Sequence, residues 1–552
     1  GDARGGAEGG IPVMKKRSPT GILFTLLLTW LVLYPVLIVV VDAGHADAIR
    51  AFISRRTEWS ALWASCWISV ASVVLAAVIG VPLAFLFEWF EFPGRKLLGS
   101  LIALPAVLPP LVGVIAFLFL YGESGFVARG LQYVFGFQQA PWRLQGAGAI
   151  LLVHAYSMYV YFYLFTRAGL AKVDAAMIEA AHALGAGRWR TLVRVTLPLL
   201  RPSLAGATLL TFMTALGSFS APYVFGGGFR VMPTQIVASR LNGQDALAMV
   251  ETVALALLAL AGLVLLRRSE GEVGVVSLGK GAAPRRRVIR TPLARVTATV
   301  AGWALAVVLL LPHLTLVLVS LVPYATWTTE AFPPVLNLDN YRRLLAEPAR
   351  LAPLVNSLWM AVVSTLGAVV IALAAGWMVV RRRVRLAKIM EALMALPWAL
   401  PGTVFAIALA TTFSVMKPLE ARWVLVGTAL ILPLAYLVRN IPVTGRAILA
   451  GYRQLDPAFE EAAASLGAGR WETFRRVSLP LLSPALMAGA SLAFVAALGD
   501  FVTSVVLYTY DTRPISMEIL SSLRLNEIGV AAAFGVVLML VSAVVLAIGA
   551  RR

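Results

Sequence analysis

The chain has 552 residues, of which 60% are hydrophobic and only 13% are charged, and its mean hydropathy is +0.84. Soluble domains contain about 25% charged residues, so this composition excludes an ordinary water-soluble enzyme. The formal net charge of +20 would suggest nucleic acid as the partner of a soluble protein. In a membrane protein the placement of the charges matters more than their sum, so we expect a lipid bilayer and no nucleic acid.

Apolar runs long enough to cross a bilayer recur along the whole chain. A helix needs about 20 predominantly apolar residues to span the hydrocarbon core. Twelve such runs are predicted as spans: 21–41, 61–87, 97–120, 147–166, 202–221, 246–266, 296–321, 354–380, 389–413, 423–443, 483–505 and 528–548. The predicted fold class is therefore an all-α polytopic membrane protein with about 12 transmembrane helices.

The distribution of basic residues predicts the orientation of these spans. Lys15, Lys16 and Arg17 precede the first span, and most of the 47 Lys and Arg residues fall on the same side of the membrane as this arm. Basic residues accumulate in cytoplasmic loops, so both termini are predicted to be cytoplasmic, in a bacterial inner membrane. The N-terminal basic stretch precedes an apolar run that is too long for a cleavable signal.

An internal repeat divides the chain into two halves. Residues 179–206 and 461–488 are identical at 18 of 28 positions, with an offset of 282. With the same offset, the segment ALGSF at 215–219 aligns with ALGDF at 497–501. Because each half has six predicted spans, the two copies share one orientation and form a parallel repeat. The predicted domains are a cytoplasmic arm (1–20), a first six-span half (21–266), a Gly- and Arg-rich cytoplasmic linker (267–295) and a second six-span half (296–552).

The chain lacks the sequence patterns of an enzyme with its own cofactor. Cys66 is the only cysteine and there are four histidines, so no metal-ligand spacing is present. Gly274, Gly279 and Lys280 resemble a phosphate-binding loop, but Gly281 stands where a Ser or Thr should hold magnesium. We expect no cofactor in this chain, and any ATP and Mg would belong to partner subunits.

The repeated block lies in a predicted cytoplasmic loop of each half. In the first copy, Asp174 is suited to cap a helix, Gly185 to turn the chain, and Pro198 to break the path before the next span. The second copy has the same residue types at Asp456, Gly467 and Pro480. The residues alone leave two interpretations open: a projection that docks a soluble partner, or a surface elbow among the lipid headgroups.

The spacing E-A-A-x3-G-x9-V-x-L-P, present in both copies, resembles the signature loop of binding-protein-dependent ABC importer permeases. A single chain with both permease halves resembles the fused permeases of the ferric-iron-uptake group. The resemblance implies two copies of an ABC ATPase subunit and an extracytoplasmic substrate-binding protein. It also implies an ATPase-docking role for Glu179, Ala180, Ala181, Gly185, Leu197, Pro198, Glu461, Ala462, Ala463, Gly467, Leu479 and Pro480.

The transport pathway is expected where the two halves meet. Pro105, Pro109 and Pro110 interrupt one predicted span, and Pro397 and Pro401 interrupt its counterpart. Small and polar residues in the Ala-Leu-Gly segments are the pathway candidates, namely Gly217, Ser218, Gly499 and Asp500. Asp500 is predicted either to attract a cation or to pair with an arginine.

The substrate is the least determined feature of the sequence. The resemblance implies ferric iron as the substrate, and thiamine, a phosphonate, a polyamine or an inorganic oxyanion are alternative substrates. No metal-binding residues are predicted. An ion-coupled secondary transporter would explain the spans and the parallel halves, but it gives no reason for the duplicated loop.

Overall fold

A computed structural model describes residues 19–107, 109–269, 287–288, 291–323, 332–382, 384–414 and 423–550. Nearly all of this is helix, and the one sheet consists of the two-residue strands β1 and β2, which pair in parallel with Phe90 opposite Arg287 and Glu91 opposite Val288. The all-α prediction is therefore confirmed. Most of the predicted arm and of the predicted linker, including Gly274 to Gly281, lies outside the described residues.

The first half contains a long series of helices with short connecting turns. Its elements are α1 (Pro19–Leu28), η1 (Thr29–Leu33), α2 (Tyr34–Asp42), α3 (Ala46–Ser54), α4 (Arg56–Trp89), β1 (Phe90–Glu91), α5 (Arg95–Ile102), η2 (Leu104–Val107), α6 (Pro110–Tyr121), α7 (Phe126–Phe135), α8 (Gly146–Leu170), α9 (Ala175–Ala183), α10 (Arg188–Thr191), η3 (Leu192–Thr196), α11 (Leu197–Leu216), α12 (Ser220–Phe225), α13 (Met232–Leu241) and α14 (Asp245–Ser269).

The second half repeats this order from α15 onward. Its elements are β2 (Arg287–Val288), α15 (Pro292–Ser320), α16 (Asp339–Ala346), α17 (Pro348–Gly376), η5 (Trp377–Arg381), α18 (Ala387–Ala399), α19 (Gly402–Thr412), α20 (Ile431–Gln454), α21 (Pro457–Ser465), α22 (Arg470–Thr473), η6 (Phe474–Ser478), α23 (Leu479–Leu498), α24 (Val502–Leu507), α25 (Ile515–Arg524) and α26 (Ile528–Ala550).

Fewer helices pass as spans than the twelve predicted. In the described part of the chain, ten helices are long and apolar enough to cross a membrane, or eleven if α18 and α19, bent by 106°, count as one span. Two predicted spans are wrong in their bounds. At 97–120 the helix that is long enough runs from Pro110 to Phe135, and at 423–443 the helix α20 begins at Ile431 and continues to Gln454. Arg439, Asn440 and Arg446 lower the hydropathy of α20, although it packs centrally against α17 and α23.

The first helix of each half packs on the other half. The α2 helix lies against α19, and Trp30 of η1 meets Phe413, just after α19, edge to face at 6.0 Å. In return α15 lies against α5 and α6, and the Tyr156 hydroxyl of α8 donates to the Leu309 carbonyl of α15 at 2.7 Å. This exchange ties the two repeats into one bundle.

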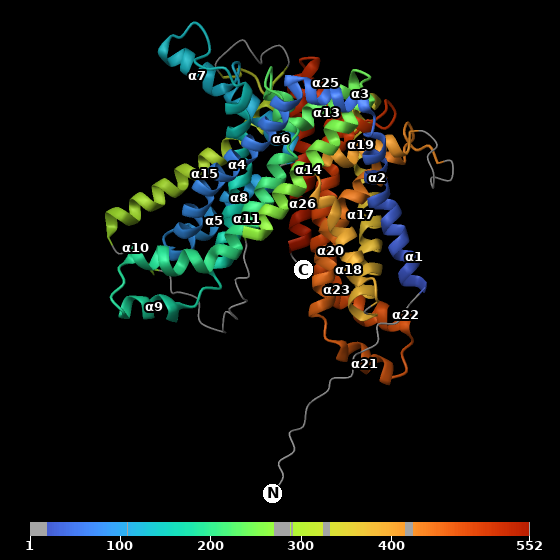
Figure 1. Ribbon diagram of the computed structural model, residues 1–552. Helices are drawn as coiled ribbons and strands as arrows, with labels where there is room; N and C mark the ends of the chain where they lie inside the picture. Colours follow the sequence, from blue (N-terminus) through green and yellow to red (C-terminus); the bar gives the residue numbers. More distant parts are fainter. Residues whose placement is uncertain are drawn as a thin grey trace.

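The bundle has two distinct ends (Figure 1). The helices α9 and α21 lie at the same end, each under its own half, and we call this the loop end. The helices α13 and α25 lie at the opposite end, where the two halves come together, whereas the halves diverge toward the loop end. Valines, leucines and isoleucines remain exposed on α1, α4, α15 and α17, as expected for surfaces that face lipid.

The close packing of α4 on α8 gives a test of this arrangement. A Cβ added at Gly80 would lie 2.4 Å from the Tyr159 carbonyl oxygen, whereas a Cβ at Gly113 of α6 would meet nothing within 4 Å. We expect Gly80→Ala to destabilise the protein by about 1–3 kcal/mol through overpacking, and Gly113→Ala to leave stability unchanged or raised. Thermal unfolding in detergent measures both, and equal melting temperatures for the two variants would contradict the packing.

Candidate functional site

The loop at the end of the first half forms a short capped helix followed by a turn. Asp174 precedes α9, and its Oδ1 accepts a hydrogen bond from the Ala176 backbone N–H at 3.0 Å, which satisfies one free donor of the first turn. Gly185 ends the helix with φ +79°, a left-handed conformation that side chains rarely adopt. Gly187 then precedes α10. The predicted cap and turn are both present.

The second copy has the same construction. Asp456 caps α21 by accepting from the Ala458 backbone N–H at 2.9 Å, and Gly467 has φ +86°. Gly469 precedes α22 as Gly187 precedes α10. The two loops are therefore matching structures as well as matching sequences.

The motif residues of both loops lie on an exposed surface. No residue of α9 or α21 is buried, and Glu179 and Glu461 are exposed, with no hydrogen bond or ion pair of their carboxylates among the described residues. Leu184 and Leu466, which sit in the turn, are each 89% exposed. Each loop therefore presents a carboxylate and a leucine side chain to its surroundings.

The two loops are attached to the bundle by different contacts. In the first half, Ile178 of α9 packs on an apolar cluster that includes Val173 and Leu200. In the second half, the equivalent residue is Glu460, which accepts from the Ser478 hydroxyl at 2.7 Å and pairs with Arg381 at 3.0 Å. Both attachments fix the base of the loop and leave the motif face free.

The prediction that Pro198 and Pro480 break the chain is wrong. Each proline is the second residue of its helix, α11 or α23, and each follows a π-helical turn, η3 or η6. Because proline lacks an N–H, one helical hydrogen bond is lost, and the wider turn accommodates this loss. Helix is therefore continuous from Arg188 to Leu216 and from Arg470 to Leu498, which connects each loop rigidly to a span. Leu197 and Leu479 begin α11 and α23.

The pathway candidates lie at a seam between the halves. Gly217 ends α11, and a Cβ added there would lie 3.6 Å from Pro401 of the second half. Gly499 ends α23, and a Cβ there would lie 2.7 Å from Pro109 of the first half. Each glycine thus touches a proline of the broken span in the other half.

Aromatic rings close this seam beyond the glycines. Phe219 and Phe501 occupy equivalent positions in the repeat, are both buried, and have ring centroids 5.5 Å apart. Tyr223 stacks on Phe219 at 5.1 Å and meets Phe501 at 5.8 Å.

Ser218 and Asp500, which occupy equivalent positions, have different partners. The Ser218 hydroxyl lies 2.8 Å from His154 Nε2, and His154 Nδ1 lies 2.8 Å from the Ser72 hydroxyl. Asp500 pairs with Arg439 and accepts from the Thr503 backbone N–H at 2.8 Å. Asp500 therefore has an arginine partner, one of the two outcomes predicted for it.

Ion pairs and hydrogen bonds fix the end opposite the loops. Glu527 joins Arg343 and Arg350, each at 2.9 Å, and hydrogen bonds from Arg350 and then Arg343 hold the pKa of Glu527 below its ordinary value. The Asn356 side chain donates to the Asp511 carbonyl at 2.9 Å. These contacts hold α16, α17 and the turn before α25 together.

In the described ranges, no group of three or more His, Cys, Asp and Glu side chains is arranged to hold a metal ion. The single cysteine, Cys66, is partly buried in α4.

The family comparison agrees with this duplicated geometry. The family described as "binding-protein-dependent transport system inner membrane component" matches residues 76–271 and again 368–551. The chain belongs to this family. The two matches each include one loop and one side of the seam, and the permease halves are thus two copies of one family unit.

Relatives extend the match over most of the chain. The probable ABC transporter permease protein y4fN of Sinorhizobium fredii is 32% identical over 476 residues, covering 86% of this chain and 83% of y4fN. The ferric transport system permease protein FbpB of Actinobacillus pleuropneumoniae is 29% identical over 79% of this chain, which spans 63% of FbpB. The molybdenum transport system permease protein ModB of Escherichia coli K12 is 38% identical over 30% of this chain and 72% of ModB.

Some residues of the seam were not found from the sequence. No role in the site was predicted for His154, Arg439, Phe219 or Phe501. The repeat offset of 282 could have paired Phe219 with Phe501. Nothing in the sequence could have shown that the two rings meet.

The turn glycine of the second loop gives a matched comparison. Gly467 has φ +86° and Gly469 has φ −67°, and a Cβ at either would meet nothing within 4 Å. We expect Gly467→Ala to cost about 1 kcal/mol of backbone strain, and Gly469→Ala to cost little. Amide hydrogen exchange across residues 456–473 should rise about fivefold in the first variant only, and equal exchange in both would contradict the turn.

The Arg439 and Asp500 pair can be converted to the residues of the first half, where Ser157 and Ser218 stand at the equivalent positions. Asp500→Ser alone leaves a charged guanidinium without its partner, and we expect a loss of about 3–5 kcal/mol of stability. The double variant with Arg439→Ser should recover most of this loss. Thermal unfolding of both variants measures the coupling, and additive losses would show that the pair does not interact.

Proposed function

We propose that this protein is the membrane-spanning subunit of an ABC importer that passes a small solute, ferric iron as the best candidate, from an extracytoplasmic binding protein to the cytoplasm. Two separate ATPase subunits would supply the energy, so this chain would carry no catalytic site. The observation that supports the proposal most strongly is the pair of matching exposed loops at one end of the bundle (Figure 1). Their end would then be the cytoplasmic face of the inner membrane, with both termini on that side.

Two equivalent loops fit a partner with two equivalent grooves. Each loop presents one free carboxylate, Glu179 or Glu461, and one exposed leucine, Leu184 or Leu466. In such a groove the leucine would contribute binding energy by burying its apolar surface, and the glutamate would fix the position of the loop by pairing with a polar or basic group of the partner. The symmetry of the loops therefore favours two copies of one ATPase over a single partner.

The continuous helices give a route for transmitting motion. If closure of the ATPases draws the loops together, α11 and α23 move with them, because each runs without a break from the loop to the seam. The Phe219 and Phe501 rings would separate as the halves rock, and the seam would open toward the binding protein. Each loop must bind the closed and open ATPase dimers with different free energies, since otherwise no motion follows.

The ferric assignment is supported by the similarity to the ferric transport permease FbpB, and the similarity to the molybdenum transport permease ModB supports an oxyanion as the alternative. Thiamine, a phosphonate or a polyamine would require the same loops and the same partners. The binding protein is expected to decide among these solutes, because the described residues contain no group of acidic and histidine side chains arranged to hold a metal.

Purification of the tagged chain from its native membrane in mild detergent tests the proposal directly. Mass spectrometry should find an ATPase subunit in two copies, and the complex should hydrolyse ATP. A chain that stays alone and inactive in several detergents would overturn the proposal and favour ion-coupled transport.

The docking role of the loop carboxylates gives a sharper test. We expect Glu179→Ala with Glu461→Ala to abolish the stimulation of ATP hydrolysis by loaded binding protein, because both contacts with the ATPases are lost. Glu472→Ala is the matched control, since Glu472 is exposed in the same loop and pairs with Arg476 at 3.1 Å. Membrane insertion should be equal in all variants. Normal stimulation in the double variant would refute the docking role.

A further inference from the structure

Three arginines lie in a row on one face of α20. Arg439, Arg446 and Arg453 are spaced by seven residues, close to two helical turns, so their side chains project in similar directions about 10 Å apart along the axis. The equivalent positions of α8 are Ser157, Leu164 and Ala171. The cationic face is therefore a feature of the second half alone.

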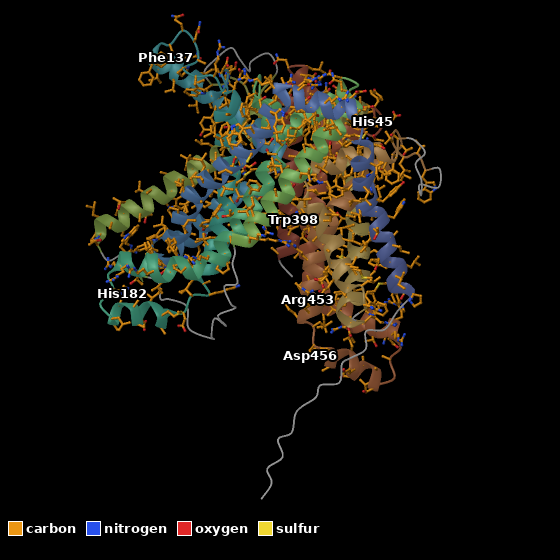
Figure 2. The ribbon with its side chains drawn as sticks, viewed as in Figure 1. His45, Phe137, His182, Trp398, Arg453 and Asp456 are labelled. Atoms are coloured by element: carbon orange, nitrogen blue, oxygen red, sulfur yellow. The ribbon has the colours of Figure 1, made fainter. Side chains whose placement is uncertain are left out.

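The middle and last arginines line a cavity of about 250 Å³ between α18 and α20. Its walls are formed by Glu391, Met394, Ala395, Pro442, Gly445, Arg446, Leu449, Ala450 and Arg453. The Arg446 guanidinium lies over the Trp398 ring, 4.5 Å from its centroid. Trp398 and Arg453 lie along the side of the second half that faces the first (Figure 2).

The charges of this row do not cancel. Arg439 pairs with Asp500, and Arg453 pairs with Glu391 at 2.8 Å. In each pair the arginine is the more exposed member, 32% against 8% and 57% against 37% of the side chain. Among the described residues Arg446 has no carboxylate partner.

The cavity wall carries a net positive charge. Its lining includes two guanidinium groups, those of Arg446 and Arg453, against one carboxylate, that of Glu391. Arg446 is exposed. A charged guanidinium facing lipid would be costly, so the exposed side of Arg446 requires water or an anion.

We propose that Arg446 contacts an anionic group of the transported solute, which is a compact oxygen-bearing anion, either a free oxyanion or an anion coordinated to iron(III). This inference rests on the proposed function and names its substrate class. A guanidinium donates paired hydrogen bonds that match the oxygens of such an anion. Uncomplexed trivalent iron would be repelled by the same charges, so iron passes here only with its charge covered by anionic ligands.

Charge-selective labelling of a thiol in the cavity tests the proposal on the full chain, without partner proteins. The background is Cys66→Ala, which removes the single native cysteine. Ala450→Cys places a thiol on the cavity wall between Arg446 and Arg453, and Ala168→Cys at the equivalent, exposed position of α8 is the matched control. The probes are a sulfonate-bearing and a trimethylammonium-bearing methanethiosulfonate, used on the chain in lipid nanodiscs.

We expect the anionic reagent to be favoured about fivefold at position 450, relative to position 168. Arg446→Gln should remove the preference, Arg446→Lys should keep it, and high salt should shrink it in the protein with native arginines by screening. Equal rates for both reagents, or a faster cationic reagent, would overturn the proposal. The salt measurement decides the case even if Arg446→Gln fails to fold.

Protection of the same thiol separates the two sources of the anion. Slower labelling in molybdate but not in ferric citrate would assign a free oxyanion, and the reverse would assign an anionic iron complex. Protection by neither, or by magnesium chloride alone, would contradict the proposal. Because no ATPase is needed, an anion preference in a chain that never binds an ATPase would refute only the proposed function.

Discussion

The contact between the repeats at the two glycines is the constraint on which the rest of the bundle depends. Helices can approach this closely only where a side chain is absent, and Gly499 meets Pro109 at a distance that leaves no room for a Cβ. Gly217 and Pro401 make the equivalent, looser contact. Each of these two contacts joins a glycine of one half to the broken span of the other half. The packing of α2 on α19 and of α15 on α6 holds the same two halves together.

The two halves share a backbone design and differ in their polar chemistry. At the seam, the first half has a hydrogen bond between His154 and Ser218, where the second half has an ion pair between Arg439 and Asp500. At the loops, the first half has an apolar contact of Ile178, where the second half has an ion pair of Glu460. In the proposed importer, motion would use the shared part, namely two loops joined to two unbroken helices. The solute would meet the part that differs, namely the row of arginines on α20.

A consequence of this division is that a single fused chain can do what two identical subunits cannot. In a symmetric dimer, an arginine at the position of Arg446 would occur once in each subunit. Fusion lets one half carry the charge while Leu164 stands at the equivalent position of the other.

The sequence by itself determined the repeated features, because each depends on local chemistry. Apolar length predicted most of the spans, and the spacing of Asp and Gly predicted two capped helices, each followed by a turn. The bounds predicted for the span at α20 are wrong because Arg439 and Arg446 lower the hydropathy of a helix that packs in the centre of the bundle. The prolines at 198 and 480 were misread because a π-helical turn absorbs the missing hydrogen bond. What only the tertiary structure decided is which side chains meet: the stacking of Phe219 and Phe501, the partner of Asp500, and the lone charge of Arg446. These contacts join residues far apart in the chain, and no local pattern encodes the distance between them.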